Sequence, residues 1–535
     1  MKIHNIAYTC LTQFCEKDLG EKPILQWIHK DLSETSFTYS DFETESNKIA
    51  NVLESLEINN EDIVTIFLPR SPLLISSYFG ILKRQAISCI LFSSLGEDAL
   101  LDRLSNSQSK ILITKNSLVR KILAIKEDLP DLKAILVVDI DEHKDHFVLS
   151  LNKLMGEVES IHKYPHQLDP ETPAFLQYTS GSTGKPKGAL HVHGAIQDII
   201  QSFKEIIQLA HDDTYWCTAD PAWITGLSYG IIAPLSTTAA SIQFGGNYNA
   251  DHWLKILKDK NVTVWYTAPT ALRMLMQEDE KKFDVVRSNS LKRIYSVGEP
   301  LNPEIYHWGK KTFGTEVYDN WWQSETGSIM IANHPGLAVK PGSMGKPRSG
   351  IDAFIMDDDM KPRPVGLQGH LTLHRGWRSM FRTYYHKEDA YAEKFHDSIY
   401  ITGDLAYQDE DGYFWYVSRS DDVINTAGHL VGPFEVESAL LEIDEIGDAA
   451  VIGVDDPLLH KKIIAFVVLP NDVIWDRTLE LKCRIYISNK VSTVATPSEI
   501  IVTDKIPKNQ SGKILRRVLR AVYEGEDPGD ISTME

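Results

Sequence analysis

Cysteine is scarce in this sequence, and the few cysteines form no metal-binding or disulfide pattern. The 535 residues include five cysteines, which are scattered and nowhere spaced as CxxC: Cys10, Cys15, Cys89, Cys217 and Cys483. An odd number of scattered cysteines argues against a disulfide framework and against a zinc site built from thiolates. We therefore expect a protein of a reducing compartment, the cytoplasm.

Long apolar runs are also missing. The most apolar stretch, residues 229–242, is interrupted by Pro234 and by hydroxyl residues. It falls short of the roughly 20 residues that a membrane span needs. Residues 1–22 contain no apolar run of the kind found in signal peptides and carry acidic side chains early. We expect neither a signal peptide nor a membrane partner.

Basic charge is in deficit. The chain has 55 Lys and Arg residues against 74 Asp and Glu residues, which gives a formal net charge of −19. Proteins that bind nucleic acids need a basic surface to meet the phosphates, so a nucleic-acid partner is not expected. Any phosphate that this protein handles must be met by local charges.

Short apolar runs alternate with amphipathic stretches over about the first 300 residues. Residues 72–84 have a helical pattern, and the segments with strand-like composition are residues 63–68, 86–92, 111–114, 134–139, 174–179, 262–266 and 293–297. Strands that alternate with helices predict βαβ units and mostly parallel sheets covered by helices. The fold class expected is α/β, with residues 1–419 forming one large N-terminal domain.

The pattern changes near residue 420. A polar stretch, residues 418–422, separates a strand-like segment at 413–417 from a new βαβ-like pattern. Its predicted elements are strands at 423–426, 449–454 and 463–469 and helices at 433–442 and 479–490. A segment of this length with its own apolar periodicity predicts a small α+β C-terminal domain over residues 420–535.

The most informative segment for function is the glycine-rich stretch at residues 178–188. Its glycines let the backbone approach a ligand closely, and its hydroxyl residues and lysines offer donors to phosphate oxygens. A predicted strand precedes it, so the loop should lie at a strand's carboxyl end, where open α/β sheets bind ligands. The stretch matches neither the Walker A pattern nor GxSxG, because Pro186 and Ser180 occupy positions that those patterns reserve for other residues.

This loop and the motifs after it resemble the adenylate-forming enzymes, which include acyl-CoA synthetases, luciferases and the adenylation domains of peptide synthetases. The further motifs occur in the family's order at residues 266–269, 296–300, 318–327, 402–404, 411–413, 419–424 and 507–513. Residues 218–220, 223–226, 321–327, 431–438 and 528–533 are most similar to acetyl-CoA synthetases. The resemblance implies a ligase that turns acetate, ATP and coenzyme A into acetyl-CoA, AMP and pyrophosphate through an acyl-adenylate, with Mg²⁺ as cofactor.

The resemblance also assigns nucleotide-binding positions residue by residue. Asp319 would accept from the adenine amino group, Trp321 would stack on adenine, and Asp404 with Arg419 would hold the ribose. The full set of predicted ATP- and AMP-binding residues is Thr179, Ser180, Gly181, Ser182, Thr183, Gly184, Lys185, Gly298, Glu299, Pro300, Asp319, Asn320, Trp321, Gln323, Ser324, Asp404 and Arg419.

Three further roles come from the same resemblance. Lys513 matches the family lysine that reaches the carboxylate and α-phosphate during adenylation, and its compact ammonium suits a point-charge role. Glu325 matches the residue that holds Mg²⁺ against the phosphates, since one carboxylate plus substrate phosphates is a normal shell for this ion. Asp421 occupies the hinge about which the C-terminal domain swings between the two half-reactions. Enzymes that acylate and deacylate lysines are possible partners at Lys513.

The acyl and coenzyme A sites complete the set. Ile224, Thr225, Val297 and Trp322 match the walls of a short acyl pocket. Gly428, counted with Lys513 as catalytic, would line the pantetheine passage, and Thr225, Asn249 and Ala427 match coenzyme A contacts. The alternative for Trp321 and Trp322 is that their indoles are only aromatic side chains of the apolar core.

Several positions depart from the family pattern. Ala427, Leu430 and Ser418 stand where relatives carry Ser, Arg and Gly. A leucine cannot make the charge-assisted hydrogen bond to phosphate that the arginine makes. Two alternatives stay open: a ligase for propionate or another small or medium acid, and, because of these departures, an adenylate-binding relative without full ligase activity. Arg516, Arg517 and Arg520 are expected on the solvated face of a helix.

Overall fold

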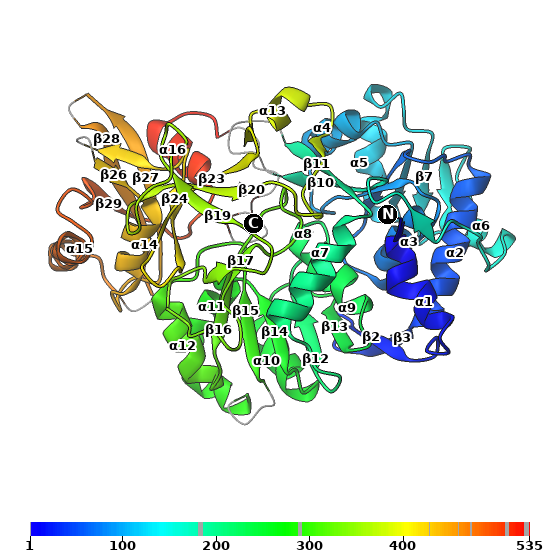
Figure 1. Ribbon diagram of the computed structural model, residues 1–535, viewed down its shortest axis with the longest axis horizontal. Helices are drawn as coiled ribbons and strands as arrows, with labels where there is room; N and C mark the ends of the chain where they lie inside the picture. Colours follow the sequence, from blue (N-terminus) through cyan, green and yellow to red (C-terminus); the bar gives the residue numbers. More distant parts are fainter. Residues whose placement is uncertain are drawn as a thin grey trace.

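The computed structural model describes residues 2–179, 186–286, 291–426, 429–457, 459–470, 473–508, 513–528 and 534. Within these residues, two large sheets with helices packed against them dominate, and two five-stranded sheets and one two-stranded sheet complete the structure. The C-terminal part of the chain is the segment after residue 419. In Figure 1 it is coloured orange to red and lies beside the green segment that carries α12 (Pro303–Phe313). The Asn302 amide donates to the Ser438 hydroxyl at 2.6 Å across this contact.

The first large sheet is mostly parallel, as predicted. Its eight strands lie in the order β21 (Thr383–Tyr384), β11 (Lys187–Val192), β10 (Pro173–Thr179), β5 (Ile87–Ile90), β4 (Ile63–Phe67), β6 (Ile111–Thr114), β7 (Ala134–Val137) and β8 (Val148–Ser150). From β10 to β8 all neighbours are parallel, and β11 and β21 are antiparallel additions. Helix α3 (Pro72–Lys83) begins at a Ser71 cap with Pro72 in its first turn, and it confirms the helix predicted at residues 72–84.

The second large sheet brings three predicted motifs to one edge. Its strands lie in the order β18 (Lys346–Pro347), β17 (Ile331–Ala332), β16 (Val317–Trp321), β15 (Arg293–Ser296), β14 (Val264–Thr267), β12 (Thr214–Cys217), β13 (Ala240–Phe244), β2 (Pro23–Ile28) and β3 (Glu34–Thr38). The strands β14, β15 and β16 are parallel, with Thr267, Ser296 and Asp319 in register. Their carboxyl ends therefore present the residues that follow at the same edge of the sheet.

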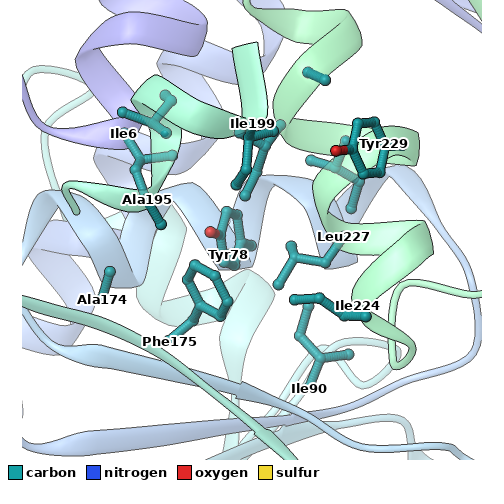
Figure 2. Close-up of a cluster of buried hydrophobic side chains, with 14 of the residues drawn as sticks. Ile6, Tyr78, Ile90, Ala174, Phe175, Ala195, Ile199, Ile224, Leu227 and Tyr229 are labelled. Carbon is teal, nitrogen blue, oxygen red and sulfur yellow. The ribbon is translucent and has the colours of Figure 1, made fainter. Parts of the chain in front are cut away.

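The largest apolar core joins both sheets. It contains Tyr78 of α3, Phe175 of β10, Ile199 of α7 (Ala195–Ser202) and Ile224 of α8 (Ile224–Leu227), all at most 6% exposed. Figure 2 shows these side chains converging on one cluster. Close packing of this kind fixes side-chain positions. The position of Ile224, a predicted acyl-pocket residue, is therefore fixed by the core.

A third sheet is antiparallel. It consists of β19 (Ala353–Met356), β20 (Gly369–His374), β23 (Ile399–Gln408), β22 (Phe395–His396) and β24 (Phe414–Arg419). Of its strands the sequence predicted only β24, at residues 413–417. Register places Asp404 of β23 directly opposite Arg419 of β24.

The C-terminal part has the predicted elements but a different topology. Its sheet contains β26 (His429–Val431), β25 (Ile424–Thr426), β28 (His460–Val468), β27 (Asp448–Asp456) and β29 (Glu499–Val502), with helices α14 (Pro433–Leu441), α15 (Arg477–Lys490) and α16 (Arg516–Glu524). The βαβ pattern holds for β28, α15 and β29, which are parallel neighbours, whereas β27 and β28 pair antiparallel. The connection between β27 and β28 is too short for a crossover, so a hairpin is the only way to pair them. The domain boundary at residues 419/420 stays a prediction and falls between β24 and β25.

Across the described ranges, every helix is too short or too polar to cross a membrane.

Candidate active site

One large cavity collects most of the predicted site residues. It has a volume of about 980 Å³ and lies where the edge of the second sheet faces β23, β24 and the C-terminal part. The predicted residues that line it are Thr179, Ile224, Thr225, Val297, Gly298, Glu299, Pro300, Asp319, Asn320, Trp321, Trp322, Gln323, Ser324, Glu325, Asp404, Arg419 and Lys513. Residues more than 300 positions apart in sequence therefore meet in one concave site, as expected for an active site.

Not every predicted residue lies in this lining. Asn249 is exposed and caps helix α10 (Ala250–Asp259), where its side chain accepts from the His252 amide at 2.9 Å. Asp421 lies just outside, with its carboxylate 3.6 Å from Arg419 Nε. Ser180, Gly181, Ser182, Thr183, Gly184, Lys185, Ala427 and Gly428 lie outside the described residues, and so does the side chain of Leu430.

The Asp404 carboxylate is the centre of a hydrogen-bond network at the predicted ribose site. Its Oδ2 accepts from Trp321 Nε1 at 3.0 Å and from Gln323 Nε2 at 2.8 Å. Its Oδ1 accepts from Arg419 Nη1 at 3.0 Å. The Asp404 charge, as the largest cause, raises the pKa of Arg419, so the guanidinium keeps its charge. The network holds Trp321 and Asp404 in fixed positions relative to one another.

Asp319 presents a buried acceptor at the edge of the second sheet. Asp319 is 5% exposed, and within the described ranges its Oδ1 has no hydrogen-bond partner. Burial raises the pKa of this carboxyl well above its ordinary value. A buried acceptor without a partner costs free energy unless a ligand donor satisfies it. The arrangement therefore fits the amino group that the resemblance assigns to Asp319.

The nucleotide loop after β15 needs a glycine. Gly298 has φ = +96°, and a Cβ at this position would have no atom within 4 Å because it would point into open space. Positive φ is easily reached only by glycine. The following residue, Glu299, accepts from the Thr270 hydroxyl at 2.5 Å, which ties the loop to α11 (Pro269–Met276).

Glu325 is held by a tyrosine that sequence reasoning missed. The Tyr384 hydroxyl donates to Glu325 Oε1 at 2.6 Å, and Lys187 Nζ lies 5.4 Å from the centre of the Tyr384 ring. Among the described residues, no group of three His, Cys, Asp or Glu side chains could hold a metal ion. A Mg²⁺ ion at Glu325 would therefore need phosphate oxygens as further ligands, which is how this ion is commonly bound.

Trp322 is locked between two tyrosines at the end of the predicted acyl pocket. Its ring lies edge-on to Tyr229, with centroids 5.0 Å apart, and its Nε1 donates to the Tyr266 hydroxyl at 3.3 Å. Tyr266 in turn donates to Asn320 Oδ1 at 2.8 Å. Ile224 and Val297 are 6% and 7% exposed and line the same cavity. These contacts make a rigid apolar wall.

Lys513 enters the cavity from the C-terminal part. Burial is the largest cause that lowers the pKa of its ammonium, followed by the charge of Arg419, while Asp422 and Asp404 act in the opposite direction. The C-terminal part is thus placed with the predicted catalytic lysine beside the predicted ribose site.

The prediction for Arg516 was wrong. Instead of lying on a solvated face, its guanidinium lines the cavity, pairs with both Glu437 oxygens at 2.6 and 2.7 Å and donates from Nε to Val451 O at 3.1 Å. Arg520 donates to the Gly453 carbonyl at 3.1 Å, and only Arg517 is exposed. Helix α16 packs on β27, so the arginines that face β27 donate hydrogen bonds to its backbone carbonyls. The signal available in the sequence was Glu437 itself, a carboxylate in a largely apolar helical stretch.

Two models of AMP-binding enzymes match the chain. Residues 13–385 match the model of the AMP-binding enzyme family, and residues 435–513 match that of the AMP-binding enzyme C-terminal domain. A protein named acetyl-coenzyme A synthetase from Bacillus subtilis (strain 168) is 40% identical over 99% of this chain and 92% of its own length. One of the same name from Pyrobaculum aerophilum is 33% identical over 99% of this chain and 85% of its own length.

Solved structures agree in fold. The anthranilate CoA ligase AuaEII in complex with anthranoyl-AMP has a TM-score of 0.89 at 26% identity and covers 97% of both chains. The acyl-CoA synthetase of Brucella canis has a TM-score of 0.75 at 27% identity and covers 98% of this chain and 95% of its own. With a family model matching well over half of its residues, the chain belongs to the AMP-binding enzyme family.

Proposed function

We propose that this chain is an ATP-dependent acyl-CoA synthetase whose preferred acid is acetate. The observation that carries the choice of acid is the position of Trp322, which is held by Tyr229 and Tyr266 and lines the cavity. A rigid indole at the end of the acyl pocket leaves room for a methyl group and excludes longer chains by overlap. The relatives named acetyl-coenzyme A synthetase, which match 99% of the chain, support the same choice.

In the first half-reaction a carboxylate oxygen of acetate attacks the α-phosphorus of ATP. The new O–P bond gives acetyl-adenylate, and the bond to the leaving pyrophosphate breaks. Both reactants are anions, so the work of the protein is to hold them in line and to neutralise charge. Lys513 supplies a positive charge at the reacting centre, and Asp404, Trp321 and Asp319 hold the nucleoside.

Glu325 would hold Mg²⁺ on the side of the phosphates, with Tyr384 fixing the carboxylate. When bound, this ion neutralises phosphate charge. Thr179 and residues 180–185 would surround the phosphates, and Gln323 and Ser324 would contact the α-phosphate and neighbouring groups.

In the second half-reaction the thiol of coenzyme A attacks the acetyl carbonyl. The C–S bond forms, the C–O bond to AMP breaks, and the thiol proton is released. We propose that residues 420–535 move about Asp421 to admit the thiol, which takes Lys513 away from the site. Gly428 would line the pantetheine passage, with Thr225, Asn249 and Ala427 as coenzyme A contacts.

Two other functions compete with this one. A ligase for propionate or a somewhat larger acid would use the same residues with a looser pocket wall. An adenylate-binding relative without thioester formation is favoured by the departures at Ala427, Leu430 and Ser418. The simultaneous presence of Lys513 and Glu325 in one cavity favours full activity.

One assay separates these functions. Exchange of labelled pyrophosphate into ATP is measured with a panel of two- to eight-carbon acids, followed by coenzyme A-dependent release of AMP. We expect exchange to be fastest with acetate and AMP release to require coenzyme A. Exchange without coenzyme A-dependent AMP release would identify an enzyme that stops at the adenylate, and fastest exchange with a longer acid would reject acetate.

We also propose a cytoplasmic enzyme that acts on small molecules, with neither a nucleic acid nor a membrane as partner. Acylation of Lys513 by a lysine-modifying enzyme would remove its charge and stop the first half-reaction.

A further inference from the structure

Lys394 is a further cation at the nucleotide cavity, and it belongs to none of the predicted motifs. It lies between α13 (Glu388–Ala392) and β22, and its side chain lines the cavity. The backbone around it is fixed, because Lys394 N donates to Tyr391 O at 3.0 Å and Ile401 N donates to Lys394 O at 2.8 Å. The neighbouring Phe395 packs on Tyr400 with ring centroids 5.6 Å apart. The backbone of Lys394 is therefore held in place, unlike that of a lysine on an exposed loop.

Two cations meet beside Gly403. A Cβ built on Gly403 would lie 3.2 Å from Arg419 Nη2 and 3.7 Å from Lys394 Nζ, so the two charged groups flank the same point of the backbone. The Arg419 charge is matched by Asp404 at 3.0 Å and by Asp421 at 3.6 Å. Within the described ranges, the Lys394 ammonium makes no hydrogen bond and no ion pair closer than 4.0 Å.

The charge of Lys394 is therefore uncompensated at close range. Burial is the largest cause that lowers the pKa of its ammonium, and the Arg419 and Lys187 charges act in the same direction. The charges of the Glu325 and Asp404 carboxylates act in the opposite direction, and that of Glu325 is the largest cause after burial. A partly buried cation beside other cations is costly unless an anion pairs with it.

We propose that Lys394 binds the α-phosphate of the nucleotide, an inference that rests on the proposed function. The charges of two carboxylates act on the ammonium. Asp404 lies at the predicted ribose site, and Glu325 lies at the predicted site of the outer phosphates. The phosphate between those two positions is the one attached to the ribose. An ammonium with no other close partner can donate to its oxygens.

This assignment separates Lys394 from Lys513. Lys394 precedes the predicted hinge, so it stays with the nucleotide when the C-terminal part moves. The α-phosphate is present in ATP, in acetyl-adenylate and in AMP. Lys394 should therefore support binding of all three, whereas Lys513 should matter in the first half-reaction alone.

The test compares AMP with adenosine as probes. Their dissociation constants are measured by titration calorimetry on the full-length wild type and on Lys394→Met, Lys394→Gln and Lys394→Arg variants. We expect the Kd of AMP to rise about tenfold or more in the Met and Gln variants, as the loss of a charge-assisted hydrogen bond implies, and to be partly restored by Arg. The Kd of adenosine should change less than about twofold.

The control variant is Lys258→Met, an exposed lysine at the end of α10, which should change neither constant. Equal weakening of AMP and adenosine would overturn the proposal, because Lys394 would then act through the shape of the Asp404 site. Unchanged AMP binding in a folded variant would also overturn it. Neither probe involves an acid or coenzyme A, so a wild type that binds AMP but does not activate acetate would reject the proposed function and leave this inference standing.

Discussion

The Arg273 guanidinium lies 3.7 Å from the Asp448 carboxylate, across the contact between the second large sheet's helices and the C-terminal part. Arg273 is also 3.9 Å from Glu299 of the nucleotide loop, and Asp448 is 2.5 Å from Lys508. These charges are mostly buried and alternate in sign. They connect the loop beside the predicted adenine site to the segment that ends at Lys513.

Asp448→Asn should slow adenylation selectively. The substitution preserves the volume of the side chain but removes the charge between Arg273 and Lys508, so the placement of Lys513 is weakened. We expect pyrophosphate exchange to fall about tenfold, which corresponds to about 1.4 kcal/mol in the barrier. Thioester formation from supplied acetyl-adenylate should stay within about twofold. Asp455→Asn, at an exposed position of the same strand, is the matched control. Equal losses in both half-reactions would contradict a positioning role.

Lys513→Ala should abolish formation of the adenylate. The ammonium neutralises charge where two anions react, and that need disappears once acetyl-adenylate exists. Thioester formation from supplied acetyl-adenylate and coenzyme A should persist. The comparison is made by single-turnover assays of each half-reaction, with exposed Lys505→Ala as control. If both half-reactions stop in a folded Lys513→Ala protein, the assignment of this lysine is wrong.

The parts of the fold that follow from local pattern could be predicted. The strands β4, β6 and β10 are short apolar runs whose position is set by periodicity, and their order predicts a covered parallel sheet. The residues after β15 and β16 were placed correctly because parallel strands end at one edge of a sheet.

Pairings between distant segments could not be predicted. Glu437 and Arg516 are separated by 79 positions, and nothing in the local sequence shows that the two side chains meet in a buried ion pair. The same holds for Arg273 with Asp448 and for Tyr384 with Glu325. Such contacts depend on how helices dock, which hydrophobic periodicity does not encode. Lys394 belongs to no motif, so only its place in the structure identified it.

Tyr384→Phe should weaken the response to Mg²⁺. The Tyr384 hydroxyl donates to Glu325 and fixes the carboxylate that would bind the ion. Loss of such a supporting hydrogen bond costs roughly 10- to 100-fold in metal affinity. We expect the Mg²⁺ concentration for half-maximal activity to rise about tenfold, while the KM for acetate stays the same and chelation by EDTA abolishes activity in every variant. Tyr385→Phe, at the adjacent position, serves as control. An unchanged Mg²⁺ response would show that Glu325 needs no support from this hydroxyl.

Glu304 should make stability depend on pH near neutrality. Burial, and next the charges of Glu442 and Asp444, raise the pKa of this carboxyl to about 7, and Arg273 opposes them. Glu442 itself is paired with Lys490 at 2.9 Å and accepts from the Tyr486 hydroxyl. An unfolded glutamate has a pKa of about 4.3, so folding takes up a proton between about 4.3 and 7. Protonated Glu304 therefore makes its full contribution to the free energy of unfolding below this range, and the contribution is lost as the pH rises through 7.

The test is the melting temperature between pH 5.5 and pH 8. We expect the wild type to lose stability over this interval and Glu304→Gln, which cannot ionise, to lose less of it and to melt higher at pH 8. The exposed Glu388→Gln variant should follow the wild type. Parallel curves for wild type and Glu304→Gln would show that Glu304 does not titrate in this range.

Trp322→Gly should change which acid the enzyme prefers. The indole is held by Tyr229 and Tyr266, so the pocket wall cannot yield to a longer chain. Attraction alone could not exclude butyrate, because each added methylene stabilises binding by only about 1–3 kcal/mol in an apolar pocket. Overlap with a rigid pocket wall can exclude butyrate. Removing the indole should move the highest kcat/KM from acetate to acids of about four to six carbons, as the pocket gains length.

The competing explanation is that Trp322 is only a core aromatic. Its loss would then cost stability, on the order of 3–5 kcal/mol, without a change in preference. Trp322→Phe separates the two, because a phenyl ring keeps part of the wall and most of the packing on Tyr229. A true pocket wall predicts a graded series, with acetate preferred by the wild type, propionate tolerated better by the Phe variant and longer acids preferred by the Gly variant. A folded Gly variant that still prefers acetate would remove Trp322 from the acyl pocket. A wild type that already prefers a longer acid would reject acetate and leave the broader proposal of an adenylate-forming acyl-CoA ligase.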